Sequence, residues 1–116
     1  MPIINLSRET TIASYVLMAD NPLTRMQGLL GRSGLHQGYA LVIKPCQSIH
    51  MFFMKFSIDV IFIDGENRVV GLVPHIKPFC LSPIFWNASS AVELNAGGIQ
   101  KSQTVLGDVL EFGGNP

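Results

Sequence analysis

Short apolar runs of strand length, separated by turn residues, dominate the chain from residue 39 onward. Runs of this length that are rich in Val, Ile and Phe are typical of β-strands. They predict strands at residues 39–44, 48–56, 58–64, 68–76, 91–95 and 105–112, the last interrupted by Gly107 and Asp108. The Asp-Gly-Glu-Asn sequence at 64–67 predicts a hairpin turn, because Gly and Asn tolerate positive φ.

The start of the chain has a different pattern. Residues 3–6 and 11–18 are apolar and β-branched with a polar break at 7–9, which predicts a hairpin. Apolar residues then recur at helical spacing after Asn21, which predicts a short helix at residues 22–31. We therefore expect a mainly β (β-rich α+β) fold, namely a small antiparallel, barrel-like or folded sheet with one short helix near residues 22–31.

Composition narrows the possible partners. The chain has 116 residues, which predicts one domain spanning residues 1–116. Charged residues make up 14% of it, against about 25% in an average soluble domain. A surface so poor in charge indicates a large core, an apolar groove or a self-association face, so a homodimer is a possible assembly. Eight basic and eight acidic residues, with no basic run, argue against nucleic acid as a partner.

The N-terminal segment is polar where a signal peptide needs an apolar core, and no stretch reaches the roughly 18 apolar residues of a membrane span. We therefore expect a cytoplasmic protein with no membrane partner. A reducing compartment favours free thiols, so Cys46 and Cys80 are expected to remain unpaired.

Cys46, His50 and Met54 recur every four residues in the central stretch and would share one face of a strand or a helix. Such soft ligands suit Cu(I), but three of them without a second histidine are too few to predict a metal, and no cofactor is expected. Cys46 could instead be a nucleophile with His50 as its base. Along a strand the two stand about 13 Å apart, so this requires a bend. Simple packing of the thiol and thioether explains the pattern best.

Two acids stand among apolar neighbours. Asp59 is flanked by isoleucine and valine, so its carboxylate requires a partner: Arg25, Arg32, His50 or a cluster of backbone amides. It could hold the fold together or belong to a site. Glu93 could form an acid and base pair with Asp59, as in glycosidases, whose carboxylates stand about 5 to 9 Å apart. A lone Glu93 exposed on a sheet surface is the simpler expectation.

The irregular segment at residues 74–90 combines three prolines with Phe79, Phe85 and Trp86. A loop of this length in a small domain is often functional. Its aromatic rings could form a stacking platform for a sugar or a base, or could cover one end of a barrel. Arg25 and Arg32 lie seven residues apart and could clamp an anion or tie the helix to the sheet.

With these residues in view, the chain resembles the DUF192 family, also called UPF0127. The matching stretches are residues 25–32, 48–50 with Met54, 58–60 with Phe62 and Asp64, 69–70, 92–94 with Ala96 and Gly97, and 107–108. The resemblance implies a compact β-barrel-like or folded-sheet domain with a short helix, and no assigned activity. It marks these positions as following the family pattern: Arg25, Gly28, His50, Met54, Asp59, Glu93, Gly97 and Asp108. The chain departs from that pattern at Met51 and Ser57.

Together these features predict a binding module whose cleft is overhung by residues 74–90 and accepts a small polar ligand such as a carbohydrate. The ligand-binding residues would be His50, Met54, Asp59, Glu93, Arg25 and Trp86. The alternatives are a hydrolase that uses Asp59 with Glu93 or His50 with Cys46, and a structural or interaction protein with an apolar subunit interface. The sequence leans against an enzyme and identifies no catalytic residue.

Overall fold

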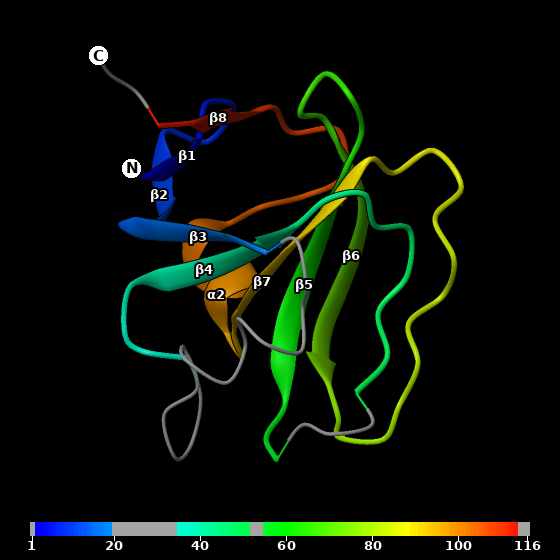
Figure 1. The fold of residues 1–116 in the computed structure, drawn as a ribbon. Coiled ribbons are helices and arrows are strands. Elements are labelled where there is room, and N and C mark those ends of the chain that lie inside the picture. Colours follow the sequence, from blue (N-terminus) through cyan, green and yellow to red (C-terminus); the bar gives the residue numbers. More distant parts are fainter. Residues whose placement is uncertain (1, 20–34, 52–54, 114–116) are drawn as a thin grey trace.

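The computed structural model describes residues 2–19, 35–51 and 55–113. Two sheets make up this part of the chain (Figure 1). The smaller has the order β2-β1-β8 and the larger the order β3-β4-β7-β5-β6. The strands are β1 (Ile3–Asn5), β2 (Thr10–Ala13), β3 (Tyr15–Ala19), β4 (Tyr39–Ile43), β5 (Ile58–Ile63), β6 (Val69–Ile76), β7 (Ser90–Asn95) and β8 (Leu110–Phe112). The strand-rich fold is as predicted, a folded pair of sheets, and no closed barrel forms within these residues.

Most strand pairs are antiparallel, as expected, but β3 and β4 run parallel, with Tyr15 opposite Tyr39. The hairpins β1–β2 and β5–β6 are confirmed. In the turn between β5 and β6, the Asp64 carboxylate accepts the backbone N–H groups of Glu66 and Arg68, and Asn67 has φ of 61°. The local turn chemistry therefore fixes this hairpin.

Two predicted elements need correction. Residues 48–51 form no regular strand; His50 makes an isolated bridge to Leu81 instead, and residues 52–54 lie outside the described part. The last strand is only β8, since Gly107 turns the chain with φ of 90°. The helix predicted at residues 22–31 lies outside the described residues. A helix that the sequence did not predict, α2 (Gly98–Ser102), follows β7.

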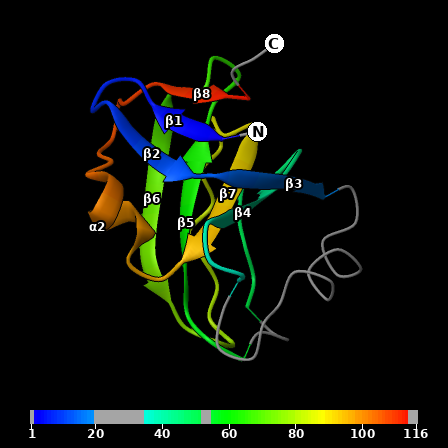
Figure 2. The same cartoon turned by 90° about the vertical axis from the view of Figure 1, so that its left-hand side faces the viewer.

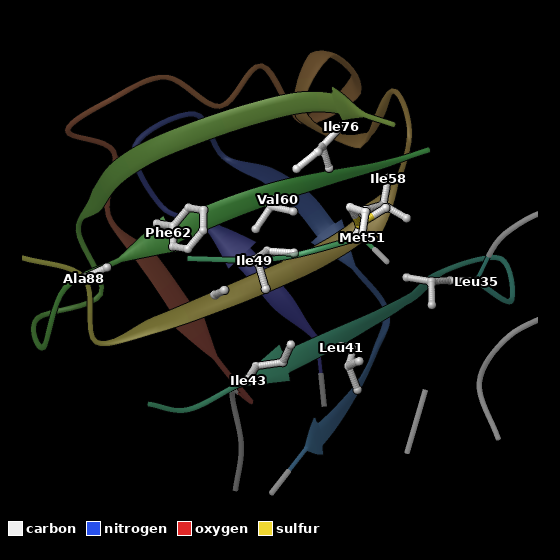
Figure 3. Packing of buried hydrophobic residues seen from close by; sticks show 11 residues of the cluster. Leu35, Leu41, Ile43, Ile49, Met51, Ile58, Val60, Phe62, Ile76 and Ala88 are labelled. Carbon is white, nitrogen blue, oxygen red and sulfur yellow. The ribbon is translucent and has the colours of Figure 1, made fainter. Parts of the chain in front are cut away.

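Each face of the larger sheet buries its own apolar cluster. One face carries Leu41, Val60 and Phe62 and is covered by residues 44–51 and 77–88; we call it the loop-covered face. Figure 3 shows Ile49 and Met51 among its side chains. The other carries Val42, Ile61, Ile63, Val92 and Leu94 and packs against α2 and the smaller sheet; we call it the helix-covered face. Figure 2 shows β1, β2 and β8 side by side, with α2 below them.

All six residues of β5 are buried, because β5 is a central strand with both faces covered. Strand β7 is likewise buried from Ser90 to Leu94. Any polar side chain on these two strands is therefore withdrawn from water and requires a partner. Asp59 on β5 and Glu93 on β7 are the two acids in this position.

Candidate functional site

Asp59 is fully satisfied by the backbone. Its Oδ1 accepts the N–H of His75 at 2.8 Å, and its Oδ2 accepts those of Gly97 at 3.2 Å and Ile99 at 2.9 Å. Of the partners that the sequence allowed, the structure selects the cluster of backbone amides. The carboxylate thus joins β6 to the start of α2, and both of its oxygens are engaged in hydrogen bonds within the fold.

The reason lies in a β-bulge opposite Asp59. Ile58 pairs with Ile76, whereas Val60 pairs with Val73, so Pro74 and His75 together face one residue of β5. Pro74 has no N–H to donate, and His75 adopts a positive φ of 50°. The Asp59 carboxylate accepts the His75 N–H, which the bulge has displaced from the ladder.

Glu93 lies on the loop-covered face, opposite Leu41 of β4 and Val60 of β5. The side chain is 1% exposed, so the expectation of a surface glutamate was wrong. Among the residues that the structure describes, none donates a hydrogen bond to its buried Oε1. Burial raises the pKa of the Glu93 carboxyl from 4.5 to about 7. At neutral pH this group is therefore poised between its two protonation states.

Asp59 and Glu93 do not form an acid and base pair. In the β5–β7 register Asp59 stands opposite Leu94, and Glu93 stands opposite Val60. Residues directly opposite share a face, so the two carboxyls point to opposite sides of one sheet. This geometry excludes the hydrolase that would use them together.

Cys46 and His50 do not form an activated pair either. The Cys46 thiol is half-buried and donates a hydrogen bond to the Ser48 carbonyl at 3.1 Å. Burial chiefly, and the Glu93 charge to a smaller extent, raise the pKa of the Cys46 thiol, and the Ser48 hydrogen bond does not offset them. A nucleophilic cysteine needs the opposite shift. His50 is exposed, at its bridge to Leu81.

The remaining predicted residues are dispersed. Trp86 is 76% exposed, and its carbonyl accepts the Gln47 side-chain amide at 2.7 Å. Met54 and Arg25 lie outside the described residues. Met51, where the chain departs from the family pattern, is fully buried in the cluster of the loop-covered face, so its side chain packs among apolar neighbours. Of the described members of the predicted cleft, Asp59 and Glu93 lie on opposite faces of the sheet, so the two acids do not line one cleft together.

No group of three or more His, Cys, Asp or Glu side chains that could hold a metal ion gathers within the described part of the chain. Cys46 and Cys80 are both free thiols. No helix in the described ranges is both long and apolar enough to cross a membrane. A pocket of about 120 Å³ does occur elsewhere, at the end of β7, where Tyr39, Asn95 and Lys101 help to line it.

A second polar centre, which the sequence did not indicate, ties the smaller sheet to the segment after α2. The Asn5 amide, fully buried, donates to Asp108 Oδ2 at 3.0 Å and to Thr104 Oγ1 at 3.1 Å. Asp108 Oδ2 also accepts the Val105 N–H at 3.0 Å and pairs with Arg8 Nε at 3.2 Å. Burial alone would raise the pKa of the Asp108 carboxyl, but these partners outweigh it and hold the pKa below its usual value. The Asp108 carboxyl therefore joins the start of the chain to the segment after α2.

The chain is similar in sequence to proteins of one family. The profile of the DUF192 family, described as "Uncharacterized ACR", matches residues 4–112. The UPF0127 protein of Thermococcus sibiricus is 33% identical in an alignment that covers 95% of this chain and 73% of that protein. The UPF0127 protein of Pyrococcus abyssi is 34% identical in an alignment that covers 95% of this chain and 96% of that protein. Both organisms are archaea.

Two crystal structures share the fold. A protein of unknown function from Novosphingobium aromaticivorans gives a TM-score of 0.73 at 17% identity, over 97% of this chain and 84% of that one. A protein from Sinorhizobium meliloti, named as a candidate transcription regulator, gives 0.72 at 21% identity, over 95% and 89%. At such identities the likeness concerns the fold alone. The match over residues 4–112 and the two archaeal relatives show that this chain belongs to the DUF192 (UPF0127) family, as its sequence motifs predicted.

Proposed function

We propose that this domain is a binding module for a small polar ligand, and that Glu93 receives a hydrogen-bond donor of that ligand. One contrast carries the proposal. The buried carboxyls of Asp59 and Asp108 each accept hydrogen bonds from three groups, whereas the buried Oε1 of Glu93 accepts none from the described residues.

An unpartnered buried carboxyl is costly. Leaving one such polar group without its hydrogen bond costs about 1–3 kcal/mol, and more if the group is charged. A ligand that brings a donor to Oε1 recovers this energy on binding. A buried acid whose oxygen has no donor is therefore a reservoir of binding free energy, as such groups at functional sites often are.

The surroundings of Glu93 favour one kind of ligand. Its direct neighbours across the sheet are Leu41 and Val60, and Ala91 lies on the same face of β7. These neighbours offer apolar contact, and the Glu93 carboxyl is the acceptor among them. A carbohydrate would present several hydroxyls that need partners, so an amine with a small apolar body matches these groups better. A cationic donor would also stabilise the ionised carboxylate.

Cys46 marks the side from which the ligand would enter. Its thiol is half-buried at the edge of the same cluster and is close enough to respond to the Glu93 charge. We propose entry along this thiol because Leu41 and Val60, the neighbours of Glu93 across the sheet, are fully buried.

The test is a thermal-shift screen with primary amines, sugars, nucleotides and small anions, at a pH above the Glu93 pKa of about 7. An amine should raise the melting temperature by binding the folded state. The increase should disappear in Glu93→Gln, because the neutral amide carries no charge for the amine and its NH₂ group is a donor that faces the donor of the ligand. It should persist in Glu111→Gln, which changes an exposed glutamate. In a Cys80→Ser background, the same amine should slow alkylation of Cys46.

Two results would remove Glu93 from any binding role. One is a complete absence of stabilisation by any compound in the panel. The other is a compound that stabilises wild type and Glu93→Gln equally, which would place its site elsewhere, for example in the pocket beside Lys101.

A further inference from the structure

Four large apolar side chains project from one short segment on the outer side of the loops. Phe79 is 74% exposed, Leu81 67%, Ile84 52% and Trp86 76%. We call these four residues the apolar strip. Exposed apolar side chains scattered singly are ordinary, but four within eight consecutive residues concentrate apolar surface on one segment, and concentrated apolar surface marks interaction sites.

The backbone holds the strip in place. The N–H of Phe79 donates to the Met51 carbonyl at 2.7 Å, and the N–H of Ser82 donates to the Ile49 carbonyl at 2.9 Å. The N–H of Phe85 donates to the Gln47 carbonyl at 2.8 Å, and its ring packs on Phe62 with centroids 4.6 Å apart. Figure 1 shows these two segments running along the same side of the larger sheet.

Because Ser82 and Phe85 anchor the segment from within, the strip residues between and beside them are presented to solvent. The backbone of Phe79 adopts a positive φ of 66°, a conformation that costs energy in an aromatic residue. The exposure is thus built into a fixed backbone.

The segments that form and hold the strip carry basic groups and no acids. Residues 44–58 and 69–92, which include both segments, contain three lysines and two histidines and no Asp or Glu. Lys77 precedes the strip directly and is exposed, and the exposed His50 bridges Leu81. An apolar strip whose own segments carry only basic groups is complementary to an anionic apolar surface.

We propose that the apolar strip docks onto an anionic lipid surface. Phe79 and Trp86 expose three-quarters of their surface, so they project outward and can enter the boundary between headgroups and acyl chains. Tryptophan favours that boundary, and lysines nearby are attracted to anionic headgroups. The absence of a spanning segment in the sequence does not bear on this, since surface docking requires none.

Other occupants fit less well. A second copy related by two-fold symmetry would place the lysines of one strip against those of the other. Single-stranded nucleic acid stacks on aromatic rings, but Leu81 and Ile84 offer no ring on which a base can stack. Both alternatives are outcomes that the experiment can distinguish.

Trp86 is the single tryptophan of the chain, so its fluorescence reports on the strip directly. We expect its emission to shift to shorter wavelength when the protein is mixed with vesicles of phosphatidylglycerol and phosphatidylcholine. Salt should weaken the effect, and vesicles of phosphatidylcholine alone should give little of it. The protein should also sediment with the anionic vesicles.

The double variant Phe79→Ser, Leu81→Ser removes two strip side chains and should lower the bound fraction roughly tenfold, because each apolar side chain contributes to insertion. Leu106→Ser, which changes a residue 63% exposed outside the strip, should bind like wild type. Equal urea midpoints for the three proteins would show that folding is unaffected.

The proposal is overturned if anionic vesicles leave the Trp86 emission and the sedimentation unchanged. It is also overturned if neutral vesicles bind equally well, or if the strip variant binds as tightly as Leu106→Ser. A dimer in light scattering that the strip variant dissociates, without vesicle binding, would assign the strip to a second copy instead.

Discussion

Asp59 and Glu93 are one register step apart on neighbouring strands, and their carboxyls point to opposite faces of the same sheet. Both are 1% exposed. Asp59 accepts three backbone N–H groups, whereas the buried oxygen of Glu93 has no donor among the described residues. The same chemical group therefore anchors the fold on one face, and on the other it carries an oxygen to which no described residue donates a hydrogen bond.

Glu93 should make the stability of the protein fall as pH rises. Its pKa is about 7 in the folded state against an ordinary 4.5, so the folded state holds the proton more tightly. The stabilisation is complete below pH 4.5 and is lost as pH rises through 7. At 1.36 kcal/mol per pH unit, the loss is on the order of 3 kcal/mol.

The Glu93→Gln variant isolates this effect, since every other titrating group is unchanged. Urea unfolding should give similar free energies of unfolding for both proteins near pH 4.5, and a more stable variant above pH 7. Parallel curves across this range would contradict the rise in the Glu93 pKa that burial causes.

Asp59→Ala should destabilise the domain severely. It leaves the N–H groups of His75, Gly97 and Ile99 without their acceptor, at about 1–3 kcal/mol for each buried donor. Urea unfolding should therefore show a loss of several kcal/mol, a large part of the 5–15 kcal/mol typical of a domain. Asp64→Ala is the matched control, because Asp64 also accepts two N–H groups, but at an exposed turn where water can replace it. Equal losses in the two variants would refute the anchoring role.

Gly71→Ala should also destabilise the protein, because an added Cβ would lie 2.5 Å from the Phe85 ring. That ring is held against Phe62, so it cannot move freely, and overpacking of this kind costs about 1–3 kcal/mol. Gly65→Ala, whose Cβ would meet only Ser89 Oγ at 3.6 Å, should have little effect in the same urea titration. A second change, Phe85→Leu, should recover part of the loss; no recovery would assign the strain elsewhere.

Asn5→Ala should cost about 1–3 kcal/mol, since it removes two buried hydrogen bonds, one of them to Asp108. Asp108 has a lowered pKa, so it stabilises the fold above pH 3.8, and this contribution is lost as pH falls through the folded-state value. Without Asn5, acid unfolding should begin at a higher pH. Arg8→Ala, which changes a side chain 43% exposed, should cost less than about 1 kcal/mol. A larger effect from Arg8 would reverse this ranking.

Local patterns predicted most of the strands, because residue alternation and turn chemistry are local properties. The Asp64 turn and the need of Asp59 for a partner followed directly from neighbouring residues. Two features did not follow. The parallel pairing of β3 with β4 depends on which strands meet in space. The helix α2 has five residues and begins with Gly98, so it offers no helical period.

Glu93 shows why the site was harder to predict than the fold. A single acid in a strand usually faces water, and that assumption predicted an exposed side chain. The central place of β7 between β4 and β5 covers both faces and overrides it. The uniformly apolar neighbours of Glu93 were the available signal. Likewise, the partners of Asp108 lie about 100 residues away, at Asn5 and Arg8, where no local pattern can point.

The pairing of Ile3 with Phe112 sets the order in which this protein can be completed. Strand β1 is synthesised before the other described strands, and its partner β8 is synthesised after them. Contacts of such sequence separation close slowly, because the intervening chain must first be ordered. During synthesis, one edge of β1 therefore remains without its strand until residues 110–112 have emerged, so the smaller sheet is expected to be completed after all strands of the larger sheet have been made.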